Sequence, residues 1–100
     1  MSVYFHFKVD PNYLGAATQN EMAIVTFVQM YETIADQMDQ ISDNDISSKG
    51  IIAESLSQLV DVLSDIKKWE VGAQFYDMRT EYINIITEHY NDITRGLSSD

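Results

Sequence analysis

The sequence predicts an all-α domain, either a helical hairpin or a three-helix bundle, with a short extended segment at its N-terminal end. Two stretches carry apolar residues at alternating spacings of three and four, which places these residues along one face of a helix. A polar stretch between them, from Ser42 to Gly50, is typical of a turn between two helices. The 100 residues correspond to one small domain, residues 1–100.

Residues 1–10 are expected to be extended. Val3, Phe5, Phe7 and Val9 alternate with more polar residues, and this period of two is typical of a strand with one apolar side. A single strand among helices needs a partner. The segment would therefore pair with its own copy in a dimer or lie extended along a helix.

The first helix is expected over residues 11–42. Asp10 and Pro11 are typical of a helix start, because Asp can cap a helix and Pro is favoured in the first turn. Gly15 would delay the regular helix to about Thr18. The spacings of the apolar seam persist for nearly three heptads, as in a coiled coil. The seam consists of Ile24, Phe27, Tyr31, Ile34, Met38 and Ile41.

Residues 43–50 are expected to form a polar hinge, and they raise the question of a calcium site. The sequence DNDISSKGIIAE supplies oxygen atoms at the first, third, fifth and twelfth positions of a helix–loop–helix calcium loop. The candidate ligands are Asp43, Asp45, Ser47 and Glu54. The motif requires glycine at its sixth position, and here Gly50 stands at the eighth. We therefore favour a simple hinge in which Asp45 or Ser47 caps the next helix.

Residues 51–97 are expected to be helical, as one long kinked helix or as two helices. The register of the apolar seam changes within KKWEVG, whose one helix-breaking residue is Gly72. An interior glycine costs a helix only about 1 kcal/mol relative to alanine, so the sequence favours one long helix with a kink. The alternative is a compact bundle with helices near residues 18–42, 47–68 and 71–96.

Composition disfavours several classes of function. Sixteen acidic and six basic residues give a net charge of −10, whereas a nucleic-acid-binding protein needs a positive surface. No apolar run is long enough for membrane insertion, and no signal peptide is recognisable, so we expect a cytoplasmic protein or one exported without a cleavable signal. The sequence shows no recognisable catalytic, cofactor or metal motif, and we expect no enzyme and no cofactor.

Two groups of residues are expected to bind a partner. Asp36, Asp39 and Asp43 lie near the C-terminal end of the first helix, where the helix dipole disfavours acids, and no base occurs between Lys8 and Lys49. A basic partner would compensate this charge. Aromatic residues also cover more than one stripe of the C-terminal half, which indicates a second buried face. The aromatic candidates are Phe27, Tyr31, Trp69, Phe75, Tyr76, Tyr82 and Tyr90.

Two short segments, together with the acidic helical layout, resemble the small WXG-type helical-hairpin proteins of type VII secretion systems and the helical accessory proteins that pair with their larger secreted toxins. VDPNYLGAA, Val9 to Ala17, resembles the segment that leads into their first helix. WEVGAQF, Trp69 to Phe75, is similar to their Trp-x-Gly turn, with one extra residue between Trp and Gly. Their C-terminal Tyr-x-x-x-Asp/Glu signal is not matched, because Thr94 follows Tyr90 by four residues. The resemblance implies pairing with another helical protein, as a secretion partner or targeting factor for a larger secreted protein.

Together these observations predict a non-catalytic helical adaptor that binds another helical protein or its own copy in a homo- or hetero-oligomer. Two alternatives remain open. One is an acidic inhibitor that imitates nucleic acid and blocks a basic site. The other is a protein with a single degenerate calcium loop.

Overall fold

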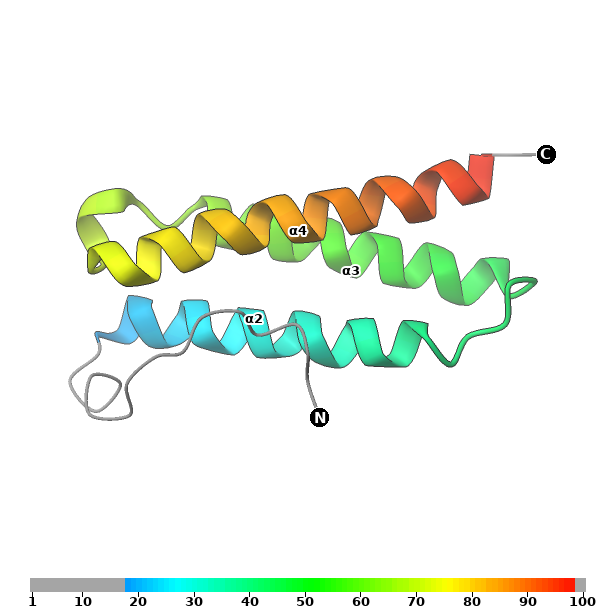
Figure 1. Ribbon diagram of the computed structural model, residues 1–100, viewed down its shortest axis with the longest axis horizontal. Coiled ribbons are helices and arrows are strands. Elements are labelled where there is room, and N and C mark those ends of the chain that lie inside the picture. Colours follow the sequence, from blue (N-terminus) through cyan, green and yellow to red (C-terminus); the bar gives the residue numbers. More distant parts are fainter. Residues whose placement is uncertain (1–17, 99–100) are drawn as a thin grey trace.

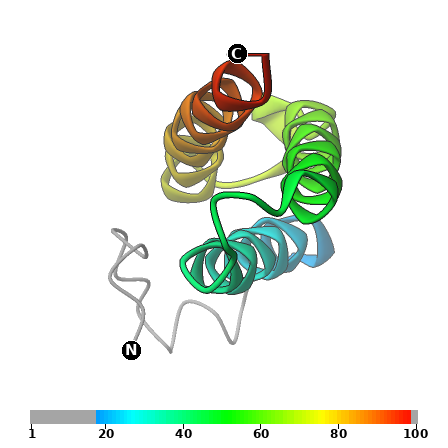
Figure 2. The ribbon, with the colours of Figure 1, turned by 90° about the vertical axis from the view of Figure 1, so that its right-hand side faces the viewer.

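The computed structural model describes residues 18–98 as a bundle of three helices in which α3 runs antiparallel to both α2 and α4 (Figure 1). Helix α2 spans Gln19–Met38, α3 spans Ile46–Ser64 and α4 spans Ala73–Ser98, while a short 3₁₀ helix, η1, spans Lys68–Glu70. Seen end-on, the three helices form a triangle around a common core (Figure 2). The all-α prediction is confirmed, in its three-helix form. The strand predicted for residues 1–10 and the helix predicted over 11–17 lie outside the described residues.

Helix α2 begins where a capping box closes its first turn. The Thr18 hydroxyl accepts a hydrogen bond from the backbone N–H of Glu21 at 3.2 Å, and the Glu21 carboxylate accepts one from the backbone N–H of Thr18 at 2.8 Å. The helix ends at Met38, four residues before the predicted end. Ile41 follows in a tighter turn and still packs against the core, so its apolar character does not require a helical backbone.

The hinge between α2 and α3 is shorter and lies earlier than predicted. Helix α3 already begins at Ile46, so residues 46–50 are helical rather than part of a loop over residues 43–50. The cause is the Asp45 side chain, which accepts hydrogen bonds from the backbone N–H of Ser48 at 3.1 Å and from its hydroxyl at 2.8 Å. The prediction that Asp45 or Ser47 caps this helix is confirmed for Asp45.

The favoured prediction of one long helix over residues 51–97 is wrong, because the chain turns between Ser64 and Ala73. The Arg79 side chain donates to the backbone carbonyl of Leu63 at 2.9 Å and to that of Ser64 at 3.2 Å, which satisfies carbonyls freed at the end of α3. At the start of α4, the Glu21 carboxylate accepts a hydrogen bond from the backbone N–H of Gly72 at 2.6 Å. Side chains distant in sequence therefore stabilise the turn between α3 and α4.

All three helices contribute to one hydrophobic core, and α4 packs most closely against α3. The largest fully buried side chains are Tyr82, Phe75, Ile24, Leu56, Leu63, Met78, Ile86 and Val28. Within residues 18–98, no helix combines the length and the apolar character that crossing a bilayer requires.

Candidate functional site

The structure divides the predicted aromatic partner-binding residues into three groups. Tyr31, Phe75 and Tyr82 are buried in the core, so they hold the helices together and are not open to a partner. This corrects the interpretation of the aromatic surplus as a second face, because three helices bury more than one stripe of α4. Phe27, Tyr76 and Tyr90 are half-buried. Trp69 is 83% exposed.

Trp69 lies in the turn between α3 and α4, within η1. This turn has a defined backbone, because the Glu70 carboxylate accepts a hydrogen bond from the backbone N–H of Lys67 at 2.7 Å. The backbone N–H of Glu70 donates in turn to the carbonyl of Lys67 at 3.0 Å. The turn therefore holds a large aromatic side chain in solvent.

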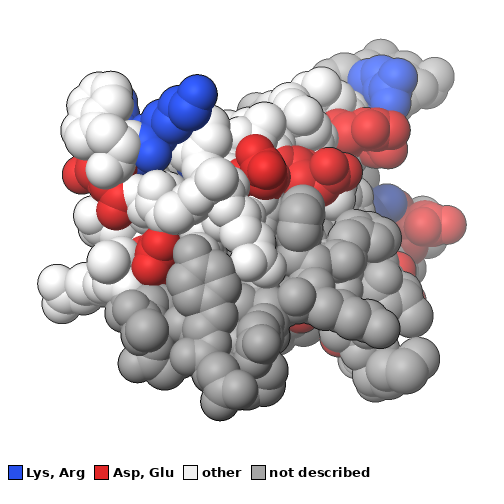
Figure 3. Space-filling view, turned by 60° about the vertical axis from the view of Figure 1, so that its left-hand side comes forward, with Lys and Arg blue, Asp and Glu red and all other residues white. Residues whose placement is uncertain are grey.

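Two further apolar side chains are exposed at the same end of the bundle. Met22 lies in the first turn of α2, and Val62 lies near the end of α3. We call Trp69, Met22 and Val62 the Trp69 end. Figure 3 turns this end toward the viewer and shows basic and acidic side chains next to uncharged surface.

Glu21 fixes the position of this turn relative to α2. Its side chain is only 5% exposed, and its two oxygens accept hydrogen bonds from the backbone N–H groups of Thr18 and Gly72. These groups stand at the N-terminal ends of α2 and α4, where helix dipoles favour a negative charge. The hydrogen bonds, that from Thr18 foremost and then that from Gly72, hold the pKa of Glu21 below its usual value.

The predicted acidic group lies at the other end of the bundle, and part of its charge is compensated within the chain. Asp36 is exposed on α2, and Asp39 is exposed at the cap that follows its last residue. Asp43 lies in the hinge, where the Lys49 ammonium donates to its backbone carbonyl at 3.0 Å and lies 3.8 Å from its carboxylate. The sequence does not reveal this contact, because only the first turn of α3 brings Lys49 back over the hinge.

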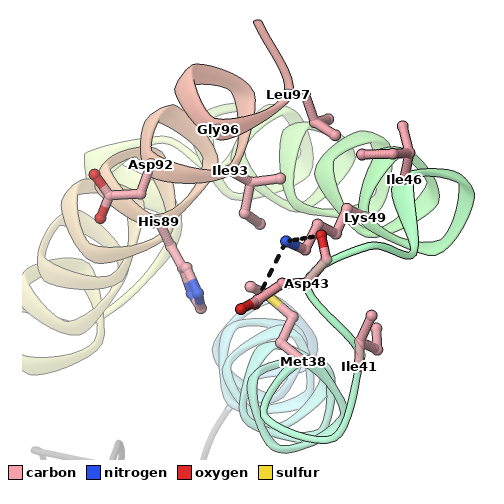
Figure 4. A pocket seen from close by; sticks show the side chains of 10 residues that line it. All are labelled: Met38, Ile41, Asp43, Ile46, Lys49, His89, Asp92, Ile93, Gly96 and Leu97. Atoms are coloured by element: carbon pink, nitrogen blue, oxygen red, sulfur yellow. Dashed lines mark hydrogen bonds and ion pairs between the residues drawn. The ribbon is translucent and has the colours of Figure 1, made fainter. Parts of the chain in front are cut away.

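A pocket of about 360 Å³ opens beside this ion pair (Figure 4). Lys49 and Asp43 approach it from α3 and the hinge, and His89 approaches it from α4. Asp92 of α4 also lines the pocket, but its carboxylate points away from it and is paired with Arg95. The remaining lining is mostly apolar, with Met38, Ile41, Ile46, Ile93, Gly96 and Leu97. Such a lining suits an apolar group better than an ion.

His89 supports the packing of α2 against α4. Its Nδ1 lies 3.1 Å from the Tyr31 hydroxyl oxygen. The two rings also make an edge-to-face contact, with their centroids 5.9 Å apart. Tyr31 makes a similar contact with Tyr82 at 6.1 Å. Sequence reasoning did not identify this group, because 58 residues separate Tyr31 from His89.

The backbone around the candidate calcium ligands is mostly helical. Ser47, at the fifth position of the motif, already lies within the regular helix α3, whereas the motif places this position in a loop. The Asp45 carboxylate is occupied by Ser48, whose hydroxyl and N–H hold the pKa of this carboxyl below its usual value. Within residues 18–98, no three His, Asp or Glu side chains are grouped so that they could hold a metal ion.

The exposed acids are distributed over every element of the described chain. They occur on all three helices, in the hinge and in the turn before α4. The hypothesis of an acidic inhibitor expects one continuous acidic face, so this distribution does not favour it.

Comparison with known proteins identifies no relative of this chain. No protein-family model, curated protein or solved structure matches the chain. Its function is therefore argued from the geometry of its own surfaces, of which the Trp69 end is the most distinctive.

Proposed function

We propose that this chain is a non-catalytic partner-binding protein that docks on another helical protein through the Trp69 end. The observation that carries the proposal is the 83% exposure of Trp69 in a hydrogen-bonded turn. Tryptophan is enriched among the residues that dominate binding energy at interfaces, because it buries a large rigid surface with little loss of conformational freedom. A turn whose backbone is already ordered by hydrogen bonds loses less conformational entropy on binding.

A second feature supports the choice of this end over the opposite one. Ile46 and Ile51 are the most exposed aliphatic side chains near the hinge, at 59% and 66%. Aliphatic residues are poorer anchors than tryptophan at protein interfaces. We therefore place the main contact at Trp69 and use Ile51 as a control.

The proposal extends to secretion through the resemblance to WXG-type proteins. WEVGAQF begins within η1 and ends in the first turn of α4, so Trp69 and Gly72 stand between two antiparallel helices. This position supports a role as a secretion partner or targeting factor, because the resemblance concerns a turn between helices. The partner would then be a larger helical protein produced by the same host.

The test is affinity capture from the native host, with mass spectrometry of the co-eluting proteins, for three forms of the full chain. We expect a helical protein to be retained by the wild type and by Ile51→Ala, and to be lost with Trp69→Ala. With the purified partner, Trp69→Ala should raise Kd by about 30-fold or more, which corresponds to the roughly 2 kcal/mol of an anchor residue. Equal retention by Trp69→Ala and the wild type would refute the proposal.

A further inference from the structure

The pocket beside the hinge has the size of a small-molecule site. Its volume is about 360 Å³, and ligand-binding pockets span about 300–1,000 Å³. At about 30 Å³ per water molecule, this space corresponds to roughly twelve waters, or to a ligand of about ten non-hydrogen atoms. We call this space, lined by the residues labelled in Figure 4, the hinge pocket.

The walls of the hinge pocket are mostly apolar and come from all three helices and the hinge. Met38 ends α2, Ile41 lies in the hinge, and Ile46 opens α3. Ile93 and Leu97 stand one turn apart on α4. Because Ile46 is still 59% exposed, an apolar occupant would cover surface that water now contacts, which favours binding.

Two of the four polar side chains that line the pocket are engaged with other residues of α4 and α2. The Asp92 carboxylate is paired with Arg95 and points away from the pocket. The Nδ1 atom of His89 lies 3.1 Å from the Tyr31 hydroxyl oxygen. The hydrogen-bonding capacity of the pocket therefore comes mainly from the other two polar side chains.

These two, Lys49 and Asp43, offer a donor and an acceptor at a spacing that one oxygen atom can bridge. The Lys49 ammonium donates one hydrogen bond to the Asp43 carbonyl at 3.0 Å, and its other two N–H groups have no hydrogen-bond acceptor among residues 18–98. The Asp43 carboxylate lies 3.8 Å from the Lys49 nitrogen, which is too far for a direct hydrogen bond. An oxygen atom about 2.8 Å from both groups fits between them, and the fully exposed Asp43 side chain leaves this position open.

The charges of this pair select the polar group of a ligand. A carboxylate would be repelled by Asp43 and by the net charge of −10, and an ammonium would be repelled by Lys49. A hydroxyl is uncharged and can accept one hydrogen bond while it donates another. We propose that the hinge pocket binds an uncharged apolar molecule through one hydroxyl group, which accepts a hydrogen bond from Lys49 and donates one to Asp43.

The first test compares three probes that share an eight-carbon chain: 1-octanol, octanoate and octylammonium. Each is titrated into the isotope-labelled full chain in about 0.15 M NaCl, which screens distant charges. Binding is measured from the backbone amide shifts of Lys49, Ile93 and Leu97 in NMR spectra.

We expect 1-octanol to bind at the hinge pocket with a Kd below about 1 mM and at least about fivefold more tightly than either charged probe. Equal affinities for the three probes would overturn the proposal, and so would tighter binding of a charged probe. Amide shifts that are absent from the hinge pocket, or that are spread evenly over the bundle, would overturn it as well.

The second test changes the two polar groups one at a time. Lys49→Met removes the donor and leaves the acid, so 1-octanol should bind about fivefold more weakly while octylammonium binds more tightly than to the wild type. Asp43→Ala removes the acceptor, and octanoate should gain affinity instead. Asp36→Ala is the matched control, because Asp36 is an exposed acid outside the pocket lining, and it should leave all three affinities unchanged. A variant of Lys49 or Asp43 that weakens all three probes equally would show a merely structural role and would overturn the proposal.

The hinge pocket and Trp69 lie at opposite ends of the bundle, so the two proposals can be separated. Trp69→Ala should bind 1-octanol as the wild type does. Lys49→Met should still retain the helical partner in affinity capture. Loss of 1-octanol binding and loss of the partner are therefore distinguishable results.

Discussion

Replacing Glu21 by alanine should destabilise the bundle more than any exposed acid does, because one carboxylate bonds two helix ends. The variant leaves the backbone N–H groups of Thr18 and Gly72 without their acceptors, which lie at 2.8 and 2.6 Å in the wild type. A hydrogen bond to a charged group contributes about 1.5–3 kcal/mol, and a helix cap contributes about 1 kcal/mol. These contributions overlap, so we expect a total loss of about 3 kcal/mol.

This loss corresponds to a fall in Tm of roughly 10–20 °C for a domain of this size. The assay is thermal and urea unfolding followed by circular dichroism, with Glu54→Ala as control, because Glu54 is an exposed residue of α3. The control should change the free energy of unfolding by less than about 0.5 kcal/mol. A Glu21→Ala protein as stable as Glu54→Ala would refute the assignment of Glu21 as the brace between α2 and the turn.

The pH dependence of the free energy of unfolding provides a second test of the role of Glu21. The pKa of Glu21 is lowered in the folded protein, so its stabilising contribution is complete above the pKa of the unfolded chain, about 4.3. The contribution is lost as the pH falls through the lower, folded-state pKa. The difference in unfolding free energy between the wild type and Glu21→Gln should therefore be constant above about pH 5 and shrink below about pH 4. A difference that grows on acidification would contradict the hydrogen-bonding pattern.

Two further sites, Arg79 and Glu32, test other polar groups of the bundle. Arg79→Ala should lower the free energy of unfolding by about 1–2 kcal/mol in urea titrations, because the carbonyls of Leu63 and Ser64 lose their donor. Arg79→Lys should recover less than half of this, since an ammonium lacks the planar fork of the guanidinium, and full recovery would show that charge alone matters. Glu32→Met should raise Tm by about 4–8 °C, because Glu32 is buried and no donor of the described residues reaches its Oε2 atom. A clear fall in Tm would show instead that the carboxylate stabilises the fold.

The helical regions could be predicted from the sequence because their signals are local. Ile24 and Tyr31 recur at helical spacing, and both are buried as this spacing requires. The capping box of Thr18 and Glu21 is also visible as a Thr-x-x-Glu pattern. Such features depend on residues within one or two turns of each other, which a single sequence displays directly.

The break before α4 could not be predicted because the groups that stabilise it are remote. Gly72 bonds to Glu21 across 51 residues, and the carbonyl of Leu63 bonds to Arg79 across 16. The residues of the candidate site could not be selected from the sequence for the same reason, because their exposure depends on contacts between helices. Phe75 and Tyr82 were predicted to bind a partner, but the packing of three helices buries both in the core. Trp69, from the same set of predicted residues, is exposed.

Tryptophan fluorescence tests the central proposal most directly, because Trp69 is the single tryptophan of the chain. In the isolated protein we expect the emission of a hydrated tryptophan and quenching by acrylamide as efficient as that of a short peptide. In the complex with the partner captured from the host, the emission should move to shorter wavelength and the quenching should fall severalfold. Emission and quenching that remain the same in the complex would contradict docking through the Trp69 end.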